Sequence, residues 1–153
     1  MKLEDVIAIN SIETGIDVKN KKELLGKMVD LAFNSGKVIN KIDALKDIFE
    51  REKLMSTGIG KGIALPHAKT NSVSDTVGSF VILRNPVDFE SLDGQPVSIV
   101  FLLLGRESNV GLHLRILSKI SRILNNDKYK NSILNFTNSQ DIINFFKQLE
   151  EDE

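Results

Sequence analysis

The chain contains two histidines, His67 and His113, and no cysteine. Without cysteine, disulfides, thiolate metal sites and cysteine nucleophiles are excluded, and imidazole is the best nucleophile available. The pKa of imidazole lies near neutrality, so much of it is unprotonated and able to attack phosphorus. Either histidine alone also fits a structural role. Together they favour phosphoryl transfer, with one ring attacking while the second ring and an arginine stabilise the phosphoryl oxygens.

Three glycines alternate shortly before the first histidine, at Gly58, Gly60 and Gly62, with Lys61 among them. Such a stretch can expose backbone N–H groups to an anion. Its spacing matches neither the phosphate loop of nucleotide hydrolases nor the dinucleotide-binding fingerprint. A tight turn between a helix and a strand explains the same glycines, and from the residues alone both interpretations stay open.

The sequence around the two histidines predicts a different environment for each ring. Pro66 stiffens the backbone just before His67, at the edge of a short apolar segment, where functional side chains are often presented. His113 lies about one turn into a helix that Ser108 or Asn109 would cap, on the stripe that faces the core. The start of a helix disfavours imidazolium and attracts anions. We therefore expect one accessible imidazole and one inward-facing imidazole. We expect no metal site.

The elements that must position these residues follow from hydrophobic spacing. The pattern predicts a helix capped by Asn20 that stops at Gly36, and a mixture of helices and short strands elsewhere. A nearly continuous apolar run at 97–104 is typical of a central strand covered by helices on both faces. The order of elements predicts an α+β fold, a three-layer α/β/α sandwich with a mixed β-sheet flanked by helices. The other expected strands are 6–9, 63–65 and 77–83, and the other expected helices are 41–54, a stripe at 116–124, 128–136 and one after 137–139.

Length and composition limit the alternatives. A chain of 153 residues with 41% hydrophobic and 27% charged residues suits a single globular domain, 1–153. The net charge of −1 argues against a nucleic-acid protein held by bulk positive charge. The longest apolar run has six residues, whereas about 20 are needed to cross a bilayer. No signal-peptide pattern opens the sequence, so we expect a cytoplasmic protein without membrane insertion.

The central motif resembles the active-site signature of a known family. The segment 56–67 reads Ser-Thr-Gly-Ile-Gly-Lys-Gly-Ile-Ala-Leu-Pro-His. It is similar to the signature of fructose/mannitol-type enzyme IIA domains (EIIA type 2) of the bacterial phosphoenolpyruvate-dependent phosphotransferase system, a group that includes nitrogen-regulatory members. Segments 86–89 and 92–97 resemble its strand-and-turn block, and 101–104 with 113–114 resemble the strand and helix around its second histidine. The resemblance extends from about residue 3 to residue 149.

The resemblance implies a phosphoryl carrier without a cofactor. Phosphate would come from the histidine-containing phosphocarrier protein onto His67, and would pass to a cysteine of a IIB domain or signal to a regulatory protein. The family's supporting histidine falls on His113 and its arginine on Arg51. No metal is required, because the donor's leaving group is already good. Ala68 departs from the family pattern, in which glycine often follows the reactive histidine.

Three classes of function remain at this point. The first is the phosphoryl carrier, and the second is a regulatory module of the same fold whose partners respond to its phosphorylation. The third is a small-anion or nucleotide-binding module that uses the Gly-rich loop without phosphoryl transfer. The third class lacks the expected loop spacing, which favours the first two.

Overall fold

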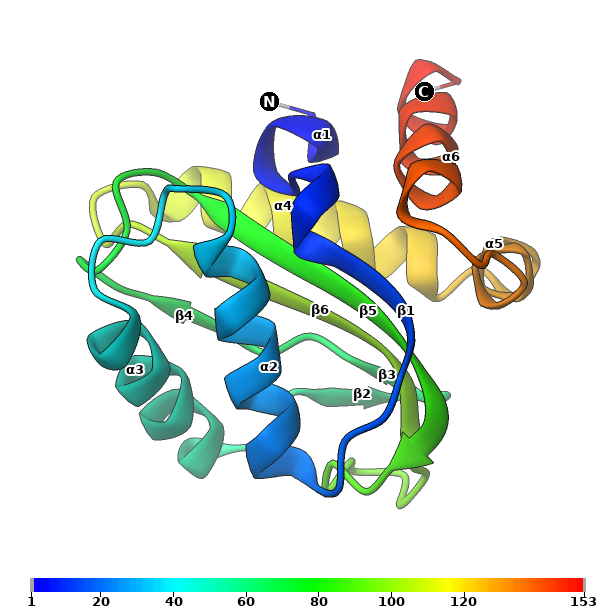
Figure 1. Cartoon of the computed structure of the whole chain (residues 1–153), viewed down its shortest axis with the longest axis horizontal. Coiled ribbons are helices and arrows are strands. Elements are labelled where there is room, and N and C mark those ends of the chain that lie inside the picture. Colours follow the sequence, from blue (N-terminus) through cyan, green and yellow to red (C-terminus); the bar gives the residue numbers. More distant parts are fainter. Residues whose placement is uncertain (1, 153) are drawn as a thin grey trace.

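A six-stranded mixed β-sheet forms the middle layer of the structure, a computed structural model that describes residues 2–152 (Figure 1). Its main path runs in the order β1-β5-β6-β3-β2, and β4 pairs with β6 beyond the end of β3. Parallel and antiparallel pairs both occur, as the sequence predicts. The strands are β1 (Ile12–Ile16), β2 (Gly58–Gly60), β3 (Ile63–Ala64), β4 (His67–Lys69), β5 (Val77–Val87) and β6 (Val97–Gly105).

Helices cover both faces of this sheet, so the predicted α+β sandwich is confirmed. Figure 1 shows α2 and α3 on one side of the strands and α4 on the other. The first face packs on α2 and α3, and the second packs on α1, α4, α5 and α6. The helices are α1 (Leu3–Val6), α2 (Lys21–Phe33), α3 (Lys41–Leu54), α4 (Val110–Leu124), α5 (Asp127–Leu134) and α6 (Ser139–Glu151), with a 3₁₀ turn at Ile9–Ser11. None of the helices in residues 2–152 is long and apolar enough to cross a membrane.

Strand β6 is the centre of the core, as its apolar run predicts. It pairs antiparallel with β5 on one side and parallel with β3 and β4 on the other. Successive side chains of a strand point to opposite faces. Leu102 and Leu104 accordingly pack toward α2 and α3, whereas Phe101 and Leu103 pack toward α4 and α6. The central strand is therefore packed between helices on both of its faces.

Asparagine side chains begin four of the helices. The Asn20 side chain accepts a hydrogen bond from the Glu23 N–H at 2.9 Å, which confirms the predicted cap of α2. The helix ends at Phe33, three residues before the predicted stop at Gly36. The same capping bond recurs at Asn40, Asn126 and Asn138.

The predicted strand at 6–9 is wrong. Residues 3–6 form helix α1, where the Asp5 carboxylate accepts the Lys2 N–H at 3.0 Å, and a 3₁₀ turn follows. The strand instead lies at β1, parallel to β5 at the edge of the sheet. A short apolar run does not distinguish a strand from a buried helical turn. Gly15, at φ 69°, also interrupts the alternation in β1.

Candidate active site

Strand β4 presents His67 next to the central strand. His67 pairs with Leu103 of β6, and the Pro66 carbonyl accepts the Leu103 N–H at 3.0 Å. The His67 side chain is half-buried. Ala68 follows on the opposite face and packs into the α2–α3 layer. Its methyl group, the departure from the family pattern, therefore points away from the His67 ring.

A backbone carbonyl fixes the orientation and the tautomer of the His67 ring. Nδ1 lies 2.7 Å from the Leu65 carbonyl oxygen, which can only accept, so Nδ1 carries the proton and donates it. The lone pair of the neutral ring is then on Nε2. Burial lowers the pKa of His67, and the Leu65 hydrogen bond opposes that shift; Arg51 lowers the pKa further and Glu52 raises it. At neutral pH the geometry presents Nε2 as a nucleophile.

His113 lies beside His67, with the two ring centroids 5.7 Å apart. It is the inward-facing ring that the sequence predicts, at 3% exposure in the first turns of α4. Its Nδ1 packs against Gly105, where a Cβ atom would collide with it, and has no hydrogen-bond partner among the described residues. Nε2 is thus the ring nitrogen left to donate a hydrogen bond.

The protonation state of His113 is set by its surroundings. Burial lowers the pKa of His113 to about 4, and the positive charges of His67 and Lys69 contribute to the shift. A ring with this pKa is neutral throughout the physiological range. It can donate one hydrogen bond without adding a charge that would repel a protonated partner.

We expect this histidine to make the protein sensitive to acid. The unfolded state binds a proton on His113 near pH 6.5, whereas the folded state resists it until about pH 4, so acidification favours unfolding. Between those values the free energy of unfolding should fall by about 3 kcal/mol on this account. Urea unfolding of the wild type and of His113→Gln, at pH values between about 4 and 6.5, measures this change in the free energy of unfolding. Parallel pH profiles for the two proteins would contradict the assignment.

The Gly-rich segment forms a tight turn between β2 and β3. Gly60, Lys61 and Gly62 all have positive φ angles, of 95°, 57° and 80°. The Lys61 N–H donates to the Asp93 carboxylate at 3.0 Å, and hydrogen bonds from the backbone of Gln95 and Lys61 lower the pKa of Asp93. Of the two interpretations that the sequence left open, the structure supports the turn, because the N–H group at its tip already has a partner. The turn joins two strands, however, and not a helix and a strand as expected.

The hydroxyls before this turn are also engaged in the fold. Ser56 Oγ donates to the Phe89 carbonyl at 2.9 Å, and Thr57 Oγ1 donates to the Glu52 carboxylate at 2.6 Å. Both hydroxyls therefore hold the loop in place.

Arg51 lies in the last turn of α3, immediately before this loop. Its Nη1 donates to the Met55 carbonyl at 3.1 Å, which keeps the guanidinium at the end of the helix. The charge of Arg51 lowers the pKa of His67. Of the three residues named from the sequence, the structure brings His67 and His113 into contact, and Arg51 acts on His67 through its charge.

Glu52, next to Arg51, is a buried carboxylate that was not expected from the sequence. It is 8% exposed and accepts hydrogen bonds from both the N–H and the hydroxyl of Thr57. A signal was available, because Glu52 lies four residues after Ile48 and eight after Ala44, on the buried stripe of α3. A charged residue at a core-facing position requires a partner. Among the described residues, no group of three or more His, Asp or Glu side chains could hold a metal ion.

Known proteins resemble this chain over most of its length. The family model described as "Phosphoenolpyruvate-dependent sugar phosphotransferase system, EIIA 2" matches residues 5–149. The "Nitrogen regulatory protein" of Bradyrhizobium diazoefficiens is 37% identical over 128 residues, covering 81% of this chain and 80% of the relative. The "PTS system fructose-specific EIIABC component" of Bacillus subtilis (strain 168) is 34% identical over 148 residues, which is 97% of this chain but only 23% of that protein.

A solved structure shows the same fold over nearly the whole chain. The nitrogen regulatory protein IIA-Ntr from Neisseria meningitidis superposes with a TM-score of 0.88 at 30% identity, covering 94% of this chain and 98% of the other. The fold and the comparisons together define a phosphotransferase-type carrier. The chain belongs to the EIIA 2 family of the phosphoenolpyruvate-dependent sugar phosphotransferase system.

Proposed function

We propose that His67 is the phosphorylated residue of this chain, and that residues 1–153 form a single IIA domain acting in the cytoplasm. The donor is the phosphohistidine of the histidine-containing phosphocarrier protein. The lone pair of His67 Nε2 forms the new P–N bond while the donor's P–N bond breaks. The donor ring leaves with the electron pair of its broken P–N bond. Because its other nitrogen carries a proton, it leaves as a neutral imidazole.

One observation carries this proposal: Nδ1 of His67 is held by the Leu65 carbonyl, so Nε2 is the free nitrogen beside a second, neutral imidazole. His113 donates to a phosphoryl oxygen, and Arg51 offsets the charge on the transferring group. His67 and its surroundings thus supply a nucleophile, a hydrogen-bond donor and a cation without a metal ion.

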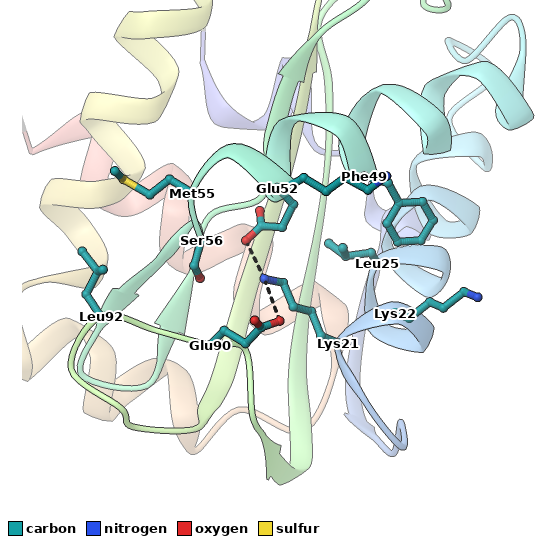
Figure 2. A pocket seen from close by; sticks show the side chains of 10 residues that line it. Lys21, Lys22, Leu25, Phe49, Glu52, Met55, Ser56, Glu90 and Leu92 are labelled. Carbon is teal, nitrogen blue, oxygen red and sulfur yellow. Dashed lines mark ion pairs between the residues drawn. The ribbon is translucent and has the colours of Figure 1, made fainter.

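Exposed apolar side chains near the site favour a protein as the reaction partner. Leu54 and Met55 follow Arg51 at 81% and 60% exposure, and Leu114 lies one residue after His113 at 59%. Leu92 is 83% exposed and lies across from Met55 in Figure 2. Large apolar groups gathered on an otherwise polar surface are typical of interaction sites. A carrier protein delivering a phosphoryl group from its own side chain needs such a surface.

The phosphoryl group passes from His67 to a second protein. The names of the relatives suggest two fates, since one is fructose-specific and another is a nitrogen regulatory protein. A further solved structure of this fold is a complex of enzyme IIA for mannitol with phosphorylated IIB. We propose either a IIB cysteine as the acceptor, or a regulatory protein that responds to the phosphorylated state.

The test is the intact mass of the chain after incubation with phosphoenolpyruvate, enzyme I and the phosphocarrier protein. We expect one added phosphoryl group that is lost in acid, as phosphohistidine is. Omitting the phosphocarrier protein should prevent the addition. A chain that stays unmodified with all components present, while a known IIA protein is labelled in the same mixture, would reject the proposal. Thermal stabilisation by nucleotides would instead favour an anion-binding module.

A further inference from the structure

A chain of hydrogen bonds links the buried Glu52 carboxylate to the His67 ring. Glu52 Oε1 accepts the Thr57 N–H at 2.7 Å, and Oε2 accepts the Thr57 hydroxyl at 2.6 Å. The Thr57 carbonyl accepts the Leu65 N–H at 2.9 Å. The Leu65 carbonyl accepts His67 Nδ1–H at 2.7 Å. The chain therefore ends on the hydrogen bond that sets the tautomer of the proposed nucleophile.

We propose that Glu52 is a positioning residue for phosphoryl transfer, which acts through Thr57 and Leu65 to hold His67 with Nε2 presented. The inference rests on the proposed function of His67. Glu52 does not touch the phosphoryl group. It fixes the strand and turn whose carbonyl orients the ring, and a reacting group must be held closely in its productive geometry.

The chemistry of Thr57 explains why a carboxylate occupies this position. Thr57 offers two donors on the same side, and an ionised carboxylate accepts both with no donor group of its own to satisfy. Hydrogen bonds to a charged acceptor are shorter and stronger than neutral ones. An amide in place of Glu52 would accept one of the two bonds well and would lose the charge.

Lys21 compensates the charge of this buried group. Its Nζ lies 3.0 Å from Glu52 Oε1, with side-chain exposures of 16% for Lys21 and 5% for Glu52. Figure 2 shows the Lys21 ammonium group between Glu52 and Glu90, and Lys21 Nζ lies 3.6 Å from Glu90 Oε1. These residues line a pocket of about 810 Å³ between α2 and the end of α3. The carboxylate is therefore held from the pocket side by a cation and from the loop side by Thr57.

The first experiment compares the rate of labelling by the phosphorylated carrier in Glu52→Gln, Thr57→Val and the double variant. We expect each single variant to slow labelling by between about tenfold and 10²-fold, because the reacting nitrogen is no longer held in place. The loss should appear in the maximal rate, since the exposed apolar surface is unchanged. The double variant should be no slower than Glu52→Gln alone, because the two residues act as one unit.

Two matched variants control for charge and for folding. Glu50→Gln removes a carboxylate from the exposed face of the same helix, where Glu50 pairs only loosely with Lys46 at 4.0 Å, and should label like the wild type. Thr57→Ser keeps the hydroxyl and should recover most of the rate lost in Thr57→Val. If Glu52→Gln fails to fold, the Thr57 pair alone still decides the question.

The second readout needs no partner protein. Nitrogen chemical shifts report the tautomer of His67, and we expect Nδ1–H alone in the wild type and a growing Nε2–H fraction in Glu52→Gln and Thr57→Val. Loss of the Glu52 charge should also lower the pKa of His67, because that charge raises it. Wild-type rates and tautomers in both variants, or losses that multiply in the double variant, would overturn the inference. A wild-type chain that accepts no phosphoryl group would reject the proposed function instead, while the tautomer still tests Glu52.

Discussion

Replacing His67 with alanine should abolish labelling of the chain by the phosphorylated carrier protein. The ring is half-buried, and only its Nε2 carries a free lone pair beside His113. The other imidazole cannot take over, because it is 3% exposed and already packed against Gly105. Intact mass should therefore show no added phosphoryl group in His67→Ala at any incubation time. The fold should persist, since the substitution removes a side chain without leaving a buried charge.

His113→Ala provides the comparison for this prediction. Labelling should still occur, because the nucleophile is intact, but transfer onward to an acceptor should slow as a phosphoryl oxygen loses its donor. Phosphohistidine analysis of the wild type should find the phosphoryl group on Nε2. Full labelling of His67→Ala, or a phosphoryl group on Nδ1, would contradict the geometry described above.

The parts of the fold that the sequence predicts are those with a strong local signal. The apolar run of β6 has one reasonable interpretation, a strand buried on both faces, and Asn20 with Glu23 marks the start of α2. Strand β4 has three residues, which is too short for any periodicity, and it was not expected from the sequence. Strand β3 has only two, although it falls within the apolar segment 63–65 where a strand was expected. The position of both strands depends on pairing with β6, a contact between segments far apart in the chain.

The candidate site also has a part that the sequence predicts and a part that it does not. Residue type identifies His67 and His113 as candidates, because few other side chains in the chain could act as nucleophiles. The short distance between the two rings is set by tertiary packing. The position of the Leu65 carbonyl, which selects the tautomer of His67, is set in the same way. Asn109 precedes α4 as expected, although its side chain makes no capping bond. A backbone carbonyl has no sequence signature, so this part of the site could not be predicted.

Arg51→Ala should produce the largest loss of rate among variants that keep both histidines. Its guanidinium lies at the end of α3 and acts electrostatically on His67, where negative charge gathers as the phosphoryl group transfers. Removing one preorganised donor of this kind costs roughly 10² to 10³-fold in rate. Arg51→Lys should recover only part of the loss, since an ammonium cannot form two parallel bonds to phosphoryl oxygens.

The electrostatic effect of Arg51 can be measured separately, through the pKa of His67. Arg51 lowers the pKa of His67, so Arg51→Ala should raise it, opposite in sign to the shift expected for Glu52→Gln. A ring with a higher pKa is protonated more at a given acidic pH, so labelling of Arg51→Ala should fall off at higher pH than in the wild type. Lys46→Ala removes the same charge from the exposed face of α3 and should change neither the pKa nor the rate. Equal titration curves for His67 in Arg51→Ala and in Lys46→Ala would show that Arg51 does not act on the reacting ring.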